Sequence, residues 1–197
     1  MFTFAAAVFF LVITPGPGVL SAAGVGAAFG FRAGLRYLLG LFLGSNMVAL
    51  AVVSGLAALI LADPIIRTLL FVASTAYLLY LALRIAFAGA KLAFIAAHSQ
   101  PGILAGVMLQ AINPKAYAVN TSFFSGFPIW EGALASEVLW KFVVMNLVWI
   151  PIHLAWLWFG GALKKMDLEP HVQRRINFAM AASMLLVVIL AALSALR

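Results

Sequence analysis

The sequence contains no cysteine and very few charged residues, and these two shortages exclude several classes of protein. Without cysteine the chain forms no disulfide, offers no thiolate to a metal and has no cysteine nucleophile. Only 9% of its 197 residues are charged, against about 25% in an average soluble domain. So few charges cannot cover the surface of a soluble fold of this size. A soluble enzyme, a disordered chain and a nucleic-acid-binding protein are therefore disfavoured.

Carboxylates are especially scarce. All five are expected in loops: Asp63, Glu131, Glu137, Asp167 and Glu169. Without a carboxylate at membrane depth, we predict neither paired-carboxylate catalysis nor a metal site. The sequence also lacks the Gly-x-Ser-x-Gly, His-Glu-x-x-His and Walker motifs. We therefore expect no enzyme activity, no cofactor and no direct use of ATP.

Apolar residues, in contrast, make up 66% of the chain. A membrane helix needs about 20 of them to cross the hydrocarbon core. Six runs with few or no charges meet or approach this length, at residues 1–31, 37–62, 68–83, 103–125, 142–163 and 176–196. The sequence thus predicts an all-α integral membrane protein, with six transmembrane helices in a single domain over residues 1–197.

The basic residues predict how these spans are oriented. Eight of them follow the first, third and fifth spans: Arg32, Arg36, Arg84, Lys91, Lys164, Lys165, Arg174 and Arg175. Three follow the other spans: Arg67, Lys141 and Arg197. Cytoplasmic loops are enriched in Lys and Arg, so we expect both termini outside the cytoplasm. No basic residue precedes Arg32, and we therefore interpret the first run as a retained helix rather than a signal peptide.

Two of the spans carry a backbone break near mid-membrane. The first is interrupted by Thr14-Pro15-Gly16-Pro17-Gly18, because proline lacks the N–H that a helix interior needs. The fourth is interrupted by Asn113-Pro114-Lys115, which joins a favoured N-cap to a favoured first helical residue. Unpaired backbone at this depth is tolerated only against protein or a water-filled cavity. For the first span, a simple packing kink is the alternative.

The two breaks occupy corresponding places in the two halves of the chain. Residues 1–90 and 101–197 each hold three spans, and this odd number turns the second half upside down relative to the first. Broken helices at such positions indicate the binding site of a secondary transporter. The half-helix starts would hold a carboxylate, and the half-helix ends would hold an ammonium group or a cation. The candidate substrate-binding residues are Thr14, Pro15, Gly16, Pro17, Gly18, Asn113, Pro114 and Lys115.

Lys115 is the one charged residue expected deep within a span. Its placement there costs at least about 2.5–3.5 kcal/mol, and its depth argues against the alternative of snorkelling to the interface. We expect Lys115 to pair with a substrate carboxylate or with a carbonyl released at Leu11 or Ile13.

Other polar residues at membrane depth are candidates for the transport pathway. His153 suits a proton relay, although a hydrogen-bonded core histidine is the alternative. Asn46 and Gln110 are candidates as well, and interhelical hydrogen bonds would explain them equally. Glycines four residues apart, such as Gly40 and Gly44, permit close helix packing, either within one chain or across a homodimer.

The sequence resembles the LysE family of lysine, homoserine and threonine exporters in several short motifs. The resemblance rests on Thr14-Pro15-Gly16-Pro17, Gly30-Phe31-Arg32-Ala33-Gly34, Gly40, Gly44, Ala76-Tyr77-Leu78-Leu79-Tyr80-Leu81, Gly106 and Asn113-Pro114-Lys115-Ala116. It covers about residues 8–125, and the last two spans match only in hydropathy and length.

The resemblance implies a secondary exporter of amino acids or close derivatives in a bacterial inner membrane, driven by an ion gradient, commonly of protons. It implies the lipid bilayer and a small-molecule substrate as the chain's partners. The family usually carries Asn after its second proline, where this chain has Gly18, and this difference leaves the substrate open. Export of an ion or another small metabolite, and a non-transporting membrane scaffold, are the alternatives.

Overall fold

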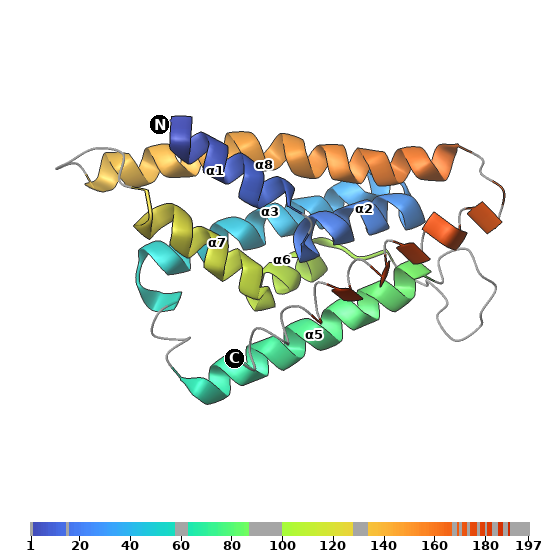
Figure 1. The fold of residues 1–197 in the computed structure, drawn as a ribbon, viewed down its shortest axis with the longest axis horizontal. Coiled ribbons are helices and arrows are strands. Elements are labelled where there is room, and N and C mark those ends of the chain that lie inside the picture. Colours follow the sequence, from blue (N-terminus) through green and yellow to red (C-terminus); the bar gives the residue numbers. More distant parts are fainter. Residues whose placement is uncertain are drawn as a thin grey trace.

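The computed structural model describes most of the chain, and every regular element in the described part is a helix (Figure 1). The described residues are 2–14, 16–57, 63–86, 100–127 and 134–166, with 169, 171, 172, 174–176, 178, 179, 181, 182, 185, 186 and 189. The helices are α1 (Phe2–Ile13), α2 (Pro17–Phe29), α3 (Phe31–Val53), α5 (Pro64–Ala86), α6 (Ile103–Ile112), α7 (Pro114–Ser125) and α8 (Leu134–Lys165). The predicted all-α fold is confirmed.

Two helices of the described part are both long enough and apolar enough to cross a membrane, α3 and the segment Leu134–Ala162 of α8. The bent pair of α1 and α2 makes a third if it counts as one span, and its two helices meet at 51°. α6 is apolar but has only 10 residues. Most of the expected sixth span, 176–196, lies outside the described residues, as does Pro15 in the first break. Six spans and inverted halves therefore stay predictions.

α8 is longer than the span expected at residues 142–163. It begins at Leu134, so that Glu137 and Lys141 lie inside a helix rather than in a loop. Both residues are buried, and the expectation that every carboxylate lies in a loop is wrong for Glu137. The two charges interrupt the apolar run without interrupting the helix, because their i,i+4 spacing places them side by side on one face.

The centre of the fold consists of two close helix pairs, α2 with α8 and α3 with α6. α8 and α5 lie at opposite sides in Figure 1, with α2, α3, α6 and α7 between them. A Cβ added at Gly40 would overlap the carbonyl of Ile103, and one added at Gly106 would overlap the backbone of Tyr37. These glycines therefore bring α3 and α6 together within the chain, as small residues do in membrane proteins.

The outward faces of α3 and α8 carry large exposed apolar side chains. Leu50 of α3 is 59% exposed, and Leu147 and Trp158 of α8 are 68% and 62% exposed. Apolar residues spread so widely over a surface are suited to lipid contact, because water would disfavour them. The helices of the described part thus fit a membrane protein.

Candidate functional site

A cavity of about 60 Å3 lies between the two helix breaks. A single water needs about 10–15 Å3 of such volume, so the cavity has room for several water-sized groups. Five of the predicted substrate-binding residues line it, all from the two breaks: Thr14, Gly16, Gly18, Asn113 and Lys115. The candidates Gln110 of α6 and His153 of α8 line it as well. Pro17, Pro114 and Asn46 are not among its lining residues.

The first break is formed by the residues between α1 and α2. α1 ends at Ile13, and α2 begins at Pro17 with Gly16 as its N-cap in an extended conformation. No side chain caps this helix start. The first N–H groups of α2 therefore sit beside the cavity with the partial positive charge of a helix start, as the sequence predicted.

The second break is formed around Asn113. Its side-chain oxygen accepts a hydrogen bond from the Lys115 backbone N–H at 3.1 Å, and its amide nitrogen donates to Gln110 Oε1 at 3.0 Å. The predicted helix start at Asn113-Pro114 is thus confirmed. Tyr117, which the sequence analysis did not single out, donates from its hydroxyl to the carbonyl of Ala111 at 2.8 Å. This bond satisfies a carbonyl released near the end of α6.

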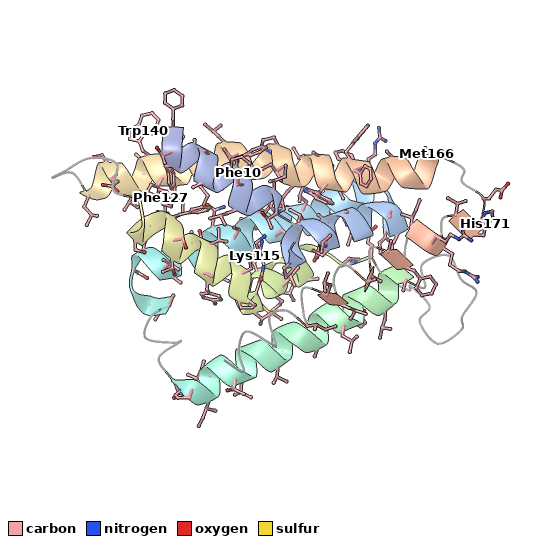
Figure 2. All side chains as sticks on the ribbon, in the orientation of Figure 1. Phe10, Lys115, Phe127, Trp140, Met166 and His171 are labelled. Atoms are coloured by element: carbon pink, nitrogen blue, oxygen red, sulfur yellow. The ribbon has the colours of Figure 1, made fainter. Side chains whose placement is uncertain are left out.

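Lys115 connects the two breaks from the middle of the molecule (Figure 2). Its Nζ donates a hydrogen bond to the carbonyl oxygen of Thr14 at 2.6 Å. The expected partner carbonyls, those of Leu11 and Ile13, are not the ones used. A cation at the end of α1 is favoured by the partial negative charge of a helix C-terminus. The lysine packs against Gly16, where an added Cβ would lie 2.7 Å from Lys115 Cδ.

His153 and Gln110 form the wall of the cavity on the side of Gly18. Both are buried, at 3% and 4% exposure. The Nδ1 of His153 lies 3.0 Å from the carbonyl oxygen of Trp149, and its ring stacks on the Trp149 ring with 3.6 Å between the centroids. These two contacts fix the orientation of the His153 ring.

Two further polar residues that line the cavity are Ser45 and Asn120. The sequence predicts both as polar residues at membrane depth but does not say which of these residues line the pathway. Asn120 lies four residues after Ala116 on α7, and Ala116 also lines the cavity. The two residues therefore lie on the face of α7 that lines the cavity.

Asn46 forms a reciprocal pair with Asn146 away from the cavity lining. Each side-chain amide donates to the other's oxygen, at 3.0 Å and 2.9 Å. The pair joins α3 to α8 by two interhelical hydrogen bonds, which are common between membrane helices.

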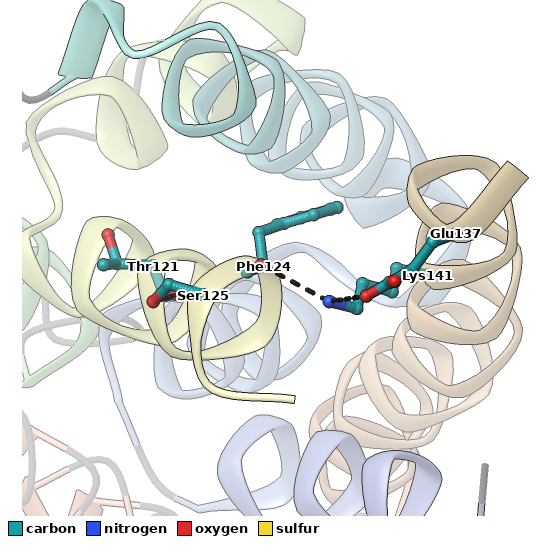
Figure 3. Close-up of polar contacts among 5 residues, drawn as sticks. All are labelled: Thr121, Phe124, Ser125, Glu137 and Lys141. Atoms are coloured by element: carbon teal, nitrogen blue, oxygen red, sulfur yellow. Dashed lines mark hydrogen bonds and ion pairs between the residues drawn. The ribbon is translucent and has the colours of Figure 1, made fainter. Parts of the chain in front are cut away.

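A buried ion pair lies at the start of α8 (Figure 3). Lys141 Nζ is 2.7 Å from Glu137 Oε1 and donates to the carbonyl oxygen of Phe124 at 3.3 Å. It therefore neutralises the carboxylate and satisfies a carbonyl at the end of α7. Within the described ranges, no group of three His, Cys, Asp or Glu side chains is placed to hold a metal ion.

Comparison with known proteins agrees with this geometry. The model of the family described as LysE type translocator matches residues 9–195, which include both breaks. The chain is 29% identical over 170 residues to cysteine/O-acetylserine efflux proteins of Salmonella choleraesuis (strain SC-B67) and Salmonella typhimurium (strain LT2), covering 86% of this chain and 85% of each relative. No solved structure matches the chain. The resemblance carried by the two proline motifs is thus confirmed, and the chain belongs to the LysE type translocator family.

Proposed function

We propose that this chain is a secondary active exporter of amino acids or their close derivatives in the bacterial inner membrane, and that it is not an enzyme. The observation that carries the proposal is Lys115, a cation held at a cavity between two helix breaks. A charged side chain inside the membrane is unfavourable in free energy, and such residues typically mark a substrate pathway. The relatives' names give cysteine and O-acetylserine as their substrates, and cysteine is the first candidate.

The substrate is held between α1, α2 and α7 by its two charged groups. Its carboxylate replaces the Thr14 carbonyl as the partner of Lys115 and approaches the N–H groups at the start of α2. Its ammonium group binds the Thr14 carbonyl beyond the end of α1, which Lys115 then releases. Opposite helix ends thus receive the opposite charges of one zwitterion.

Transport is driven by an ion gradient, with protons as the coupling ion. The missing Walker motif in the sequence supports a secondary mechanism. The proposed transporter has six spans in two inverted halves, with both termini outside the cytoplasm. In this topology the two breaks lie at the same depth in the membrane. Rocking of one half against the other then exposes the cavity alternately to each side of the membrane.

Counterflow in proteoliposomes tests this function. Vesicles are loaded with a pool of unlabelled amino acids, and uptake of each labelled amino acid is compared between wild type, Lys115→Ala and Leu147→Ala. The last variant is the control, because Leu147 lies on the exposed face of α8. We expect wild type and the control to exchange one or a few amino acids and Lys115→Ala to lose this exchange.

Folded wild-type protein that exchanges no amino acid would contradict the proposal. The same vesicles would then be tested with inorganic ions and other small metabolites, and inactivity toward these would favour a non-transporting scaffold. Full exchange by Lys115→Ala would remove the lysine from the mechanism.

A further inference from the structure

The cavity wall beside Gly18 carries two polar atoms that the substrate's charged groups do not use. A Cβ added at Gly18 would lie 3.3 Å from Nε2 of His153 and 3.4 Å from Nε2 of Gln110. Both nitrogens therefore converge on the space that the missing side chain leaves open. All three residues line the cavity.

The chemistry of the His153 nitrogen follows from its other ring nitrogen. A backbone carbonyl accepts hydrogen bonds but never donates them, so Nδ1 must carry the proton that bonds to the Trp149 oxygen. In the neutral ring, Nε2 is then a hydrogen-bond acceptor. Stacking on Trp149, with 12° between the two ring planes, keeps this acceptor aimed at Gly18.

Gln110 presents the complementary group. Its Oε1 accepts from the Asn113 amide at 3.0 Å, and this bond turns its Nε2 toward Gly18. Both nitrogens face the cavity that their residues line, so a donor and an acceptor are available to one ligand group.

We propose that Gly18, Gln110 and His153 form the subsite for the substrate's side chain, and that it selects a short side chain ending in a hydroxyl or thiol. Such a group donates its hydrogen to His153 Nε2 and accepts one from Gln110 Nε2. Gly18 supplies the volume. This inference rests on the proposed function, because Lys115 anchors the other end of the substrate.

The charge of the cavity limits the alternatives. None of the described residues that line it is acidic, so a basic side chain finds no counter-ion. The subsite therefore favours serine or cysteine over lysine by charge, and over alanine by the hydrogen bonds.

The test is the ratio of serine to alanine exchange in proteoliposome counterflow, because these two substrates differ only by the hydroxyl. We expect wild type to prefer serine, and also cysteine, by about tenfold, since a site that binds a hydroxyl discriminates against the analogue without it. In His153→Phe the ring is kept and Nε2 is lost, so the ratio falls toward one. Gln110→Leu is a second variant with the same expected result.

Matched controls separate the subsite from general damage. Leu147→Phe adds a ring on the exposed face of α8, and Gly102→Ala adds a Cβ where no atom lies within 4 Å. Both should keep the wild-type ratio, whereas Gly18→Ala should lower serine exchange more than glycine exchange. Counterflow needs no proton gradient, so a relay role for His153 alone would leave the ratio unchanged.

The outcomes distinguish the two proposals. If wild type exchanges amino acids but exchanges serine and alanine at equal rates, the subsite is overturned and the exporter function is retained. A preserved preference for serine in both His153→Phe and Gln110→Leu overturns it as well. Wild type that exchanges no amino acid overturns the exporter function, and the subsite falls with it.

Discussion

The ammonium group of Lys115 lies 2.6 Å from the carbonyl oxygen of Thr14, although 101 positions separate the two residues in the sequence. The contact holds the end of α1 against the start of α7, so it joins the two helix breaks directly. A carboxylate that binds Lys115 must compete with this carbonyl. In the proposed binding mode, substrate binding would therefore break the hydrogen bond that joins the two helix breaks.

Arginine should not replace Lys115, although it keeps the positive charge. The lysine stem passes so close to Gly16 that a single added carbon there would lie 2.7 Å from Cδ. The planar, broader guanidinium needs more room and cannot act as a compact point charge. We expect Lys115→Arg to lower the counterflow rate at least tenfold while its yield in detergent stays close to wild type. A rate near that of wild type would mean that charge alone is required.

Gly16→Ala should impair transport through the same contact. The new Cβ would meet Lys115 Cδ at 2.7 Å and Nζ at 2.9 Å, so the flexible lysine must move away from Thr14. Gly102→Ala is a matched control, because Gly102 is also an N-cap glycine and an added Cβ there meets no atom within 4 Å. Both variants carry the same small loss of N-cap preference.

The measurement is the initial counterflow rate of the two alanine variants side by side. We expect a rate several-fold below wild type for Gly16→Ala and a rate close to wild type for Gly102→Ala. Equal rates for the two variants would contradict the role of Gly16 in positioning Lys115.

The breaks could be predicted from the sequence because they arise from local chemistry. Proline removes a backbone donor wherever it stands, and Asn113 caps the residues next to it. The partner of Lys115 could not be predicted, because the carbonyl within its reach depends on the direction in which α1 bends away from α2. That direction is set by tertiary packing, which cannot be predicted from a local motif.

The same distinction explains the error at Glu137 and Lys141. A search for uncharged runs counts each charge as the end of a span, whereas the folded chain pairs the two charges across one helical turn. The sequence does not indicate that Asn120 lines the cavity, for a related reason. Its place in the cavity lining depends on which face of α7 turns toward α1, and that is again a matter of packing.

The Asn46–Asn146 pair should stabilise the contact of α3 with α8. We predict that Asn46→Leu and Asn146→Leu each lower the thermal stability of the protein in detergent. The double variant should lose less stability than the two single variants lose together, because each single variant leaves one amide without its partner. The coupling free energy in a double-mutant cycle should be about 0.6 kcal/mol and at most about 1.7 kcal/mol, as for other membrane helix pairs. Strictly additive losses would contradict the pairing.

Glu137 and Lys141 should be far more sensitive to single substitution than an exposed ion pair. Their side chains are 12% and 3% exposed, and removal of one partner from a buried pair costs about 3–5 kcal/mol because the other charge is left uncompensated. Glu169 and His171 provide the comparison, with 76% and 61% of their side chains exposed. Exposed pairs contribute only about 0–1 kcal/mol.

We therefore expect Glu137→Leu or Lys141→Met alone to lower the melting temperature in detergent strongly, and Glu169→Gln to leave it close to wild type. The double variant Glu137→Leu/Lys141→Met should recover most of the loss, since apolar side chains replace both charges together. Lys141 also donates to the Phe124 carbonyl, and this bond is not restored, so recovery should be incomplete. Single variants as mild as Glu169→Gln would contradict the buried pairing, because they would mean that water reaches the first turns of α8.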